Sequence, residues 1–190
     1  MRVHRTWLCV AAVIAFSIGV QAAPFVLFPK AGELASYDGR FVVRNIDPGA
    51  HRSEYVGTFH SLFLEEMASG RTRKLCDYVG VAAVTWTKND WLIVTEYLSK
   101  RTSRALIFAA DNSREPVVID QPLLTNLVPL KLRPQLREND HVFVEAMQVE
   151  GDMLTVRVWG YGKHDTDGFR WLCEYSLLEG AISCEEMTRP

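Results

Sequence analysis

Short apolar segments broken by glycine, asparagine and aspartate run through most of this 190-residue chain. Three tight turns are expected at Asp38-Gly39, Asn89-Asp90 and Asn139-Asp140, because short polar side chains hydrogen-bond their own backbone and tolerate left-handed dihedral angles. Each turn precedes an apolar and β-branched run that suits a buried strand. The even spacing of the three turns indicates a structural repeat. The pattern therefore predicts repeated antiparallel meanders.

Further hairpins fill the intervals between these turns. Gly70, Gly151 and Gly180 fall where a type I turn with a glycine bulge needs a left-handed residue. Residues 104–108 and 117–119 are apolar enough to form two more strands. Short strands separated by turns at this spacing are typical of all-β domains.

One region breaks the pattern. Residues 121–139 contain three prolines among leucines, and we expect an irregular connection there, with a helical turn near residues 134–137. No long amphipathic helix and no linker to a second domain is indicated. We therefore expect a single all-β domain over residues 23–190, built of antiparallel meanders in three propeller-blade-like or sandwich-like sheets.

The first two turns carry a family resemblance. Residues 36–43, Ser-Tyr-Asp-Gly-Arg-Phe-Val-Val, resemble the Ser-Pro-Asp-Gly-Arg opening of blades in TolB-type and WD40-like bacterial propellers. Residues 84–87, Val-Thr-Trp-Thr, are similar to a second such opening, although Tyr37 and Thr87 stand where the family has proline. The resemblance implies blade-like meanders. A closed propeller typically has 4–8 blades and this chain has room for about three, so the meanders form an open or sandwich-like arrangement or several chains associate.

Residues 1–22 have the composition of a cleavable signal peptide. Arg2, His4 and Arg5 form a positive head, the uncharged apolar run follows, and small residues precede Ala23. The run over residues 7–20 is shorter than the roughly 20 residues that a membrane-spanning helix needs. We therefore expect a cleaved leader rather than an anchor, no membrane span after cleavage, and a periplasmic or secreted mature chain.

Charge excludes one class of partner. Cleavage removes two of the 21 lysines and arginines and none of the 23 acids, so the formal charge moves from −2 to about −4. Nucleic-acid binding depends on concentrated cationic surface that displaces counterions. We therefore expect no nucleic-acid partner.

Three cysteines remain in the mature chain. A hairpin turn at Leu178-Glu179 places Cys173 opposite Cys184, and directly opposed strand residues are close enough for a disulfide. In an oxidising compartment two of the three cysteines can pair. We predict the Cys173–Cys184 disulfide; a bridge from Cys76 to one of the two, or three free thiols, are the alternatives.

The loop at residues 160–168 and the strand ends beside it combine aromatic, acidic and glycine residues. Large rings beside polar groups are the usual composition of a recognition patch. The candidate binding residues are Trp159, Tyr161, His164, Asp165, Asp167 and Trp171. Three other interpretations stay open: part of a calcium loop through the two aspartates, a base formed by His164 beside Asp165, or a solvated loop in which glycines form turns.

The sequence indicates no catalytic residue, no metal site and no cofactor. The histidines of the mature chain do not pair with another His or Cys at two or four residues' spacing. No serine has a nucleophile-elbow context. Adjacent acids such as Glu65 and Glu66 face opposite sides of a strand, which makes them poor candidates for a cooperating acid and base.

These features favour an exported, non-enzymatic binding or interaction protein of the bacterial cell envelope, with another envelope or secreted protein as its partner. Two alternatives remain. One is a hydrolase of envelope polymers that uses acids and His164, and the other is a structural β module that assembles with itself. The ligand, the oligomeric state and the strand order are left open by the sequence.

Overall fold

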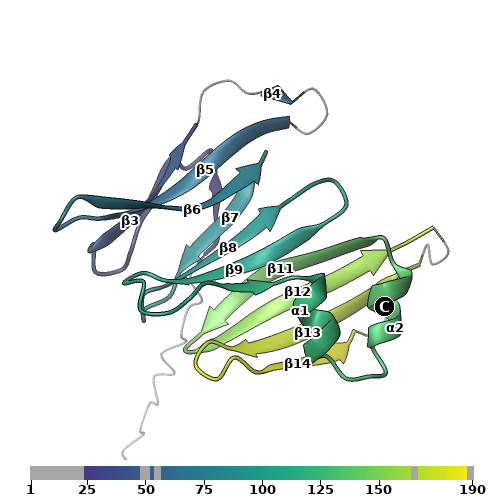
Figure 1. Cartoon of the computed structure of the whole chain (residues 1–190). Helices are drawn as coiled ribbons and strands as arrows, with labels where there is room; N and C mark the ends of the chain where they lie inside the picture. Colours follow the sequence, from purple (N-terminus) through teal and green to yellow (C-terminus); the bar gives the residue numbers. More distant parts are fainter. Residues whose placement is uncertain (1–23, 48–51, 54–56, 164–166, 188–190) are drawn as a thin grey trace, which may run out of the picture.

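Three antiparallel sheets lie one above another in the fold (Figure 1). The computed structural model describes residues 24–47, 52–53, 57–163 and 167–187, so the predicted signal peptide, residues 1–22, lies outside the described residues. We name the layers the N-terminal, middle and C-terminal sheets, after their order along the chain. The expected all-β fold with three sandwich-like sheets is confirmed.

In the N-terminal sheet, β3 lies between β2 and β5, and β5 also pairs with β6 and with the short β4. Its strands are β2 (Glu33–Ala35), β3 (Phe41–Ile46), β4 (Arg52–Ser53), β5 (Gly57–Glu66) and β6 (Arg71–Val79). The middle sheet has the order β1-β7-β8-β9-β10. Its strands are β1 (Val26–Phe28), β7 (Ala82–Trp86), β8 (Trp91–Tyr97), β9 (Ser103–Ala109) and β10 (Val117–Ile119).

The C-terminal sheet is a simple meander with the order β11-β12-β13-β14. Its strands are β11 (His141–Glu150), β12 (Met153–Tyr161), β13 (Phe169–Ser176) and β14 (Ile182–Glu186). One face of this sheet packs on the middle sheet, and the other face is the outer surface of the stack (Figure 1).

The middle sheet is buried on both faces. Ile93 and Ile107 face the C-terminal sheet, whereas Leu92 and Val94 face the N-terminal sheet, and all four are at most 1% exposed. A continuous apolar run is what a strand covered on both sides requires, because its side chains alternate between two cores. This explains why β8 is buried at consecutive positions while β12 and β13 of the C-terminal sheet alternate.

Two of the three expected tight turns are built alike. Gly39 and Asp90 both have left-handed φ angles, of 71° and 59°. The Ser36 hydroxyl oxygen accepts a hydrogen bond from the Phe41 amide at 3.1 Å, and the Thr87 hydroxyl oxygen accepts one from the Trp91 amide at 3.0 Å. The two turns therefore share a hydroxyl cap and a left-handed residue, but the first loop spans residues 37–40 and the second, one residue shorter, spans 88–90.

The third member of the repeat differs, and so does the segment before it. Residues 121–139 contain two helices, α1 (Gln121–Leu127) and α2 (Arg133–Glu138), where we expected an irregular connection with one helical turn. Asp120 caps α1 by accepting the Leu123 amide hydrogen at 2.9 Å, and Pro122 and Pro134 occupy first-turn positions where they cost no hydrogen bond. Asn139 ends α2 with an extended φ of −111° instead of opening a hairpin.

The expected disulfide and glycine turns are confirmed. Cys173 lies directly opposite Cys184 in the β13–β14 ladder, with their Cα atoms 4.1 Å apart, and the two sulfur atoms are bonded. Cys76 is the remaining free thiol among the described residues. Gly70, Gly151 and Gly180 all have φ angles between 58° and 70°.

Candidate functional site

The predicted recognition residues fall on different sides of the C-terminal sheet. Trp159 and Tyr161 lie on its outer face, near the end of β12, and Asp167 is exposed just before β13. His164 and Asp165 lie outside the described residues. The base and the calcium loop that we considered at these positions are therefore not described.

The grouping of Trp171 with this surface is wrong. Trp171 pairs with Val158 on β12, whereas Trp159 pairs with Arg170, and successive residues of a strand point to opposite faces. The Trp171 side chain is 0% exposed in the core between the middle and C-terminal sheets. Its indole nitrogen donates a hydrogen bond of 2.7 Å to the side-chain oxygen of Gln135 on α2.

Four aromatic rings stack across β11 and β12, and we call this set the aromatic face: His141, Phe143, Trp159 and Tyr161. His141 lies opposite Tyr161 with ring centroids 4.5 Å apart and an interplanar angle of 5°. Phe143 lies opposite Trp159 at 4.1 Å and 13°. Rings at these distances lie face to face, so each pair covers one face of both its members.

Exposure on the aromatic face increases toward the 160–168 loop. Phe143 is 7% exposed although it lies on the outer side of the sheet, because the Trp159 ring covers it, whereas Tyr161 is 38% exposed. Leu172, 43% exposed, and the exposed Arg170 flank the rings from β13. The result is a surface of ring edges, one hydroxyl, one guanidinium and an aliphatic side chain.

The other end of the same sheet face is charged. Glu145 accepts a hydrogen bond from Arg157 Nε at 2.9 Å and another from the Tyr97 hydroxyl at 3.2 Å. These bonds satisfy the carboxylate within the protein. The sheet face therefore divides into a self-paired polar half and an aromatic half.

Two glycines allow close packing of the backbone at the base of the 160–168 loop. A Cβ added at Gly168 would lie 1.9 Å from the Gly160 carbonyl oxygen, and Gly168 also has a left-handed φ of 63°. A Cβ at Gly160 would meet a carbon of the Phe169 ring at 2.6 Å. Both positions therefore require glycine for close backbone approach, in addition to the turn formation that we expected.

Sequence reasoning missed His141 and Phe143. Both precede the hairpin that carries the predicted residues, and the pairing of β11 with β12 brings them beside Trp159 and Tyr161. The sequence signal that could have revealed them is the hairpin turn at Gly151, which makes β11 and β12 neighbours. A β-bulge between Ala146 and Gln148 then sets which residues face one another.

A second cluster of titratable groups lies between the N-terminal and middle sheets. Glu96 is 3% exposed and accepts a hydrogen bond from Arg104 Nε at 2.8 Å; burial raises the pKa of its carboxyl group. Burial, helped by the nearby Glu96 charge, raises the pKa of the Cys76 thiol to about 12. A thiol with such a pKa is protonated at neutral pH, and the thiolate is the nucleophilic form. Cys76 is therefore a poor nucleophile at neutral pH.

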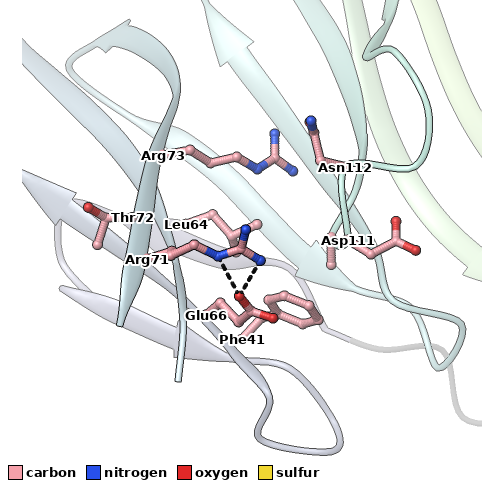
Figure 2. Close-up of a pocket in the computed structure, with 9 residues that line it drawn as sticks. Phe41, Leu64, Glu66, Arg71, Thr72, Arg73, Asp111 and Asn112 are labelled. Atoms are coloured by element: carbon pink, nitrogen blue, oxygen red, sulfur yellow. Dashed lines mark hydrogen bonds and ion pairs between the residues drawn. The ribbon is translucent and has the colours of Figure 1, made fainter. Parts of the chain in front are cut away.

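One cavity, of about 510 Å³, opens between the N-terminal and middle sheets (Figure 2). Its walls come from the ends of β5 and β6 and from the turn after β9. Figure 2 shows Arg71 and Arg73 reaching from β6 toward that turn, with Glu66 beside Arg71. Phe41, Leu64 and Ala110 are the apolar residues of its lining.

In the part of the chain that the structure describes, no group of three or more His, Cys, Asp or Glu side chains is arranged to hold a metal ion. None of the helices within the described ranges combines the length and the apolar character needed to cross a membrane.

Comparison with known proteins gives no family. No protein-family model and no curated protein sequence matches this chain.

Proposed function

We propose that this chain is an exported, non-enzymatic protein of the bacterial cell envelope that recognises another envelope or secreted protein through its aromatic face. One observation carries the proposal: four aromatic rings are stacked on an outer sheet face, next to exposed Arg170 and Leu172. Tyrosine, tryptophan and arginine are the residues most enriched at the energetic centres of protein interfaces.

The orientation of the rings favours a protein partner over a sugar. His141 and Tyr161 cover each other, and Phe143 and Trp159 cover each other, at centroid distances of 4.5 and 4.1 Å. A sugar ring binds best on an open aromatic face, and one face of each ring is already occupied. Ring edges with a tyrosine hydroxyl offer instead a low-entropy apolar surface with a hydrogen-bonding group, as protein interfaces use.

Two observations support export. The leader pattern of residues 1–22 matches a cleavable signal peptide. The Cys173–Cys184 disulfide suits an oxidising compartment, because cytosolic thiols are kept reduced. Protein recovered from the periplasm or the medium is expected to begin at Ala23; recovery from the cytosol with Met1 still present would contradict export.

The recognition proposal is tested by matched tyrosine variants. Tyr161 on the aromatic face is 38% exposed, and Tyr37 in the first tight turn is 57% exposed, so both can be replaced by Ala without opening the core. An envelope partner captured by crosslinking is then purified and titrated against each variant. Removal of a hot-spot tyrosine costs 2 kcal/mol or more, so Tyr161→Ala is expected to weaken binding roughly 30-fold. Tyr37→Ala is expected to bind as the unmodified protein does.

Two outcomes would redirect the proposal. If both variants bind the partner equally well, the aromatic face is not the contact. If the mature protein forms dimers that Tyr161→Ala abolishes, the occupant of the face is a second copy, as expected for a self-assembling module. Light scattering over a range of concentrations distinguishes the second outcome.

A further inference from the structure

We propose that the cavity between the N-terminal and middle sheets is a binding site for a monocarboxylate that carries an apolar group, with Arg73 as the residue that recognises the carboxylate. The site is separate from the aromatic face, which lies on the outer side of the C-terminal sheet. Its volume of about 510 Å³ is within the range of roughly 300–1,000 Å³ found for small-molecule sites.

The two arginines of the cavity differ in what they already bind. Arg71 and Arg73 are two residues apart on β6, so they share one face of the strand. Arg71 donates two hydrogen bonds to one oxygen of Glu66, from Nε at 3.0 Å and from Nη2 at 2.7 Å. Its charge is therefore balanced within the protein.

Arg73 has no such balance among the described residues. Its Nη2 donates a hydrogen bond of 2.8 Å to the Ala109 carbonyl oxygen, and no described carboxylate forms an ion pair with it. Arg73 is partly buried, and burial lowers the pKa of its guanidinium, while the charge of Asp111 opposes that effect. A partly desolvated guanidinium with free N–H groups favours an added anion.

The nearest acid is directed elsewhere. Asp111 accepts the Ser113 amide hydrogen at 2.9 Å in a local turn. Figure 2 shows its carboxylate on the side away from both arginines. Asp111 therefore contributes negative potential to the cavity without occupying the Arg73 N–H groups.

The charge of the cavity selects the kind of anion. Glu66 balances Arg71, and the charge of Asp111 partly offsets that of Arg73. Arg40 also lies near both acids but is itself paired with Asp38 and Asp90. The surplus positive charge is therefore at most that of one guanidinium, which favours a monoanion over a dianion. A planar carboxylate matches the fork of the guanidinium in two parallel hydrogen bonds. Phe41, Leu64 and Ala110 form the apolar part of the lining, and they favour an apolar group next to the carboxylate.

Three probes test this assignment on the mature protein. N-acetyl-L-phenylalanine carries the carboxylate and an apolar ring, its carboxamide analogue differs only in the lost charge, and phenyl phosphate carries a dianion. Each is titrated by NMR or calorimetry to about 10 mM, which reaches the weak affinities expected of small ligands. The carboxylate is expected to bind at least tenfold more tightly than the carboxamide and than phenyl phosphate.

Variants assign the effect to the residue. Arg73→Gln is expected to lose the preference for the carboxylate, whereas Arg101→Gln, at an exposed turn outside the cavity, is expected to keep it. Tyr161→Ala is also expected to bind the probe normally, which separates this site from the aromatic face. Denaturation curves test whether Arg73→Gln is folded. If it is not, Arg73→Lys is used in its place, and it should weaken binding of the carboxylate probe because the paired hydrogen bonds are lost.

The proposal is overturned by any of three results. The carboxylate probe does not bind the unmodified protein, or the carboxamide or the phosphate binds as tightly, or the Arg73 variant keeps the preference.

Discussion

The Cys173–Cys184 disulfide gives a stability prediction whose size follows from chain length. The two cysteines are 11 residues apart, and closing a loop of that size removes roughly 9 cal/mol/K of chain entropy from the unfolded state. At 25 °C this amounts to about 2–3 kcal/mol. Since a domain of this kind is stabilised by about 5–15 kcal/mol in total, reduction should remove a sizeable share without unfolding the protein.

Urea denaturation with and without a reductant measures this contribution. With a denaturant slope of about 2 kcal/mol/M, the midpoint of the unmodified protein should fall by about 1–1.5 M on reduction. The double variant Cys173→Ala/Cys184→Ala should show no effect of the reductant. Cys76→Ala, which leaves the bridge intact, should show the full effect.

The reasoning fails if the reductant leaves the midpoint of the unmodified protein in place after thiol titration confirms complete reduction. It also fails if Cys76→Ala removes the effect, because the stabilising bridge would then involve the third cysteine. Cys184 is only half-buried, so the reductant has access to the bridge.

Three further predictions concern the core, the loop base and pH. Gly168→Ala should lower the free energy of unfolding by more than about 2 kcal/mol, because its Cβ would overlap a carbonyl oxygen at 1.9 Å. Gly151→Ala, which has a left-handed φ of 58° but open space around it, should lower it by about 1 kcal/mol. Urea midpoints compare the two variants. Trp171→Phe should lose about 2–3 kcal/mol through its indole hydrogen bond and lost core volume, while Trp159→Phe on the outer face should lose less than about 1 kcal/mol, again by denaturation. The raised pKa of Glu96 means that the folded chain keeps this proton to higher pH than the unfolded chain does, so the free energy of unfolding should fall as pH rises from the ordinary to the raised pKa; Glu96→Gln should remove that part of the pH slope.

The parts of the fold that depend on local turns were predictable from the sequence. The hairpin centred on residues 178–179 fixes its own register, because each step away from a symmetric turn adds one residue to both strands. Cys173 and Cys184 therefore had to face each other once the turn was recognised, and they do. The same local logic placed left-handed glycines at Gly70 and Gly151.

The helices before the C-terminal sheet were not predictable in the same way. Three prolines in residues 121–139 argued against regular structure. Pro122 and Pro134 both lie in first turns, however, where a missing amide hydrogen has no cost. Leu124 and Leu136 then bury completely against the core, and this tertiary contact stabilises helices too short to form alone.

The register of the aromatic face depends on a β-bulge that no local sequence pattern indicates. Beyond the turn, Gln148 pairs with Thr155, but Ala146 pairs with Val156, so Met147 is an extra residue in β11. Bulges of this kind change which side chains of a strand face the core. Counting outward from the turn would therefore assign every earlier residue of β11 to the wrong face.

The bulge keeps the Glu145 carboxylate out of the core. If the register set by Gln148 and Thr155 continued without a bulge, Glu145 would lie opposite Val158, on the buried face, and Phe143 would lie opposite Gly160. An unpaired carboxylate in that core would be costly. With the bulge, Glu145 reaches Arg157 on the outer face instead, at 2.9 Å. The bulge thus places both the Glu145 carboxylate and the stacked Phe143 ring on the outer face.

The two ends of the sheet stack differ in a way that bears on where recognition is proposed. On the outer side of the N-terminal sheet, Arg44 donates a hydrogen bond of 2.7 Å to Glu65 across the strands, and Lys74 pairs with Asp77 at 2.6 Å. A partner on that side would have to desolvate charges that are already satisfied, with little gain in return. The aromatic half of the C-terminal sheet exposes rings whose burial is favourable and which lack a competing ion pair among the described residues. Tyr161 lies at the exposed end of that half, so its removal tests the choice between the two ends of the stack more directly than any change on the charged face.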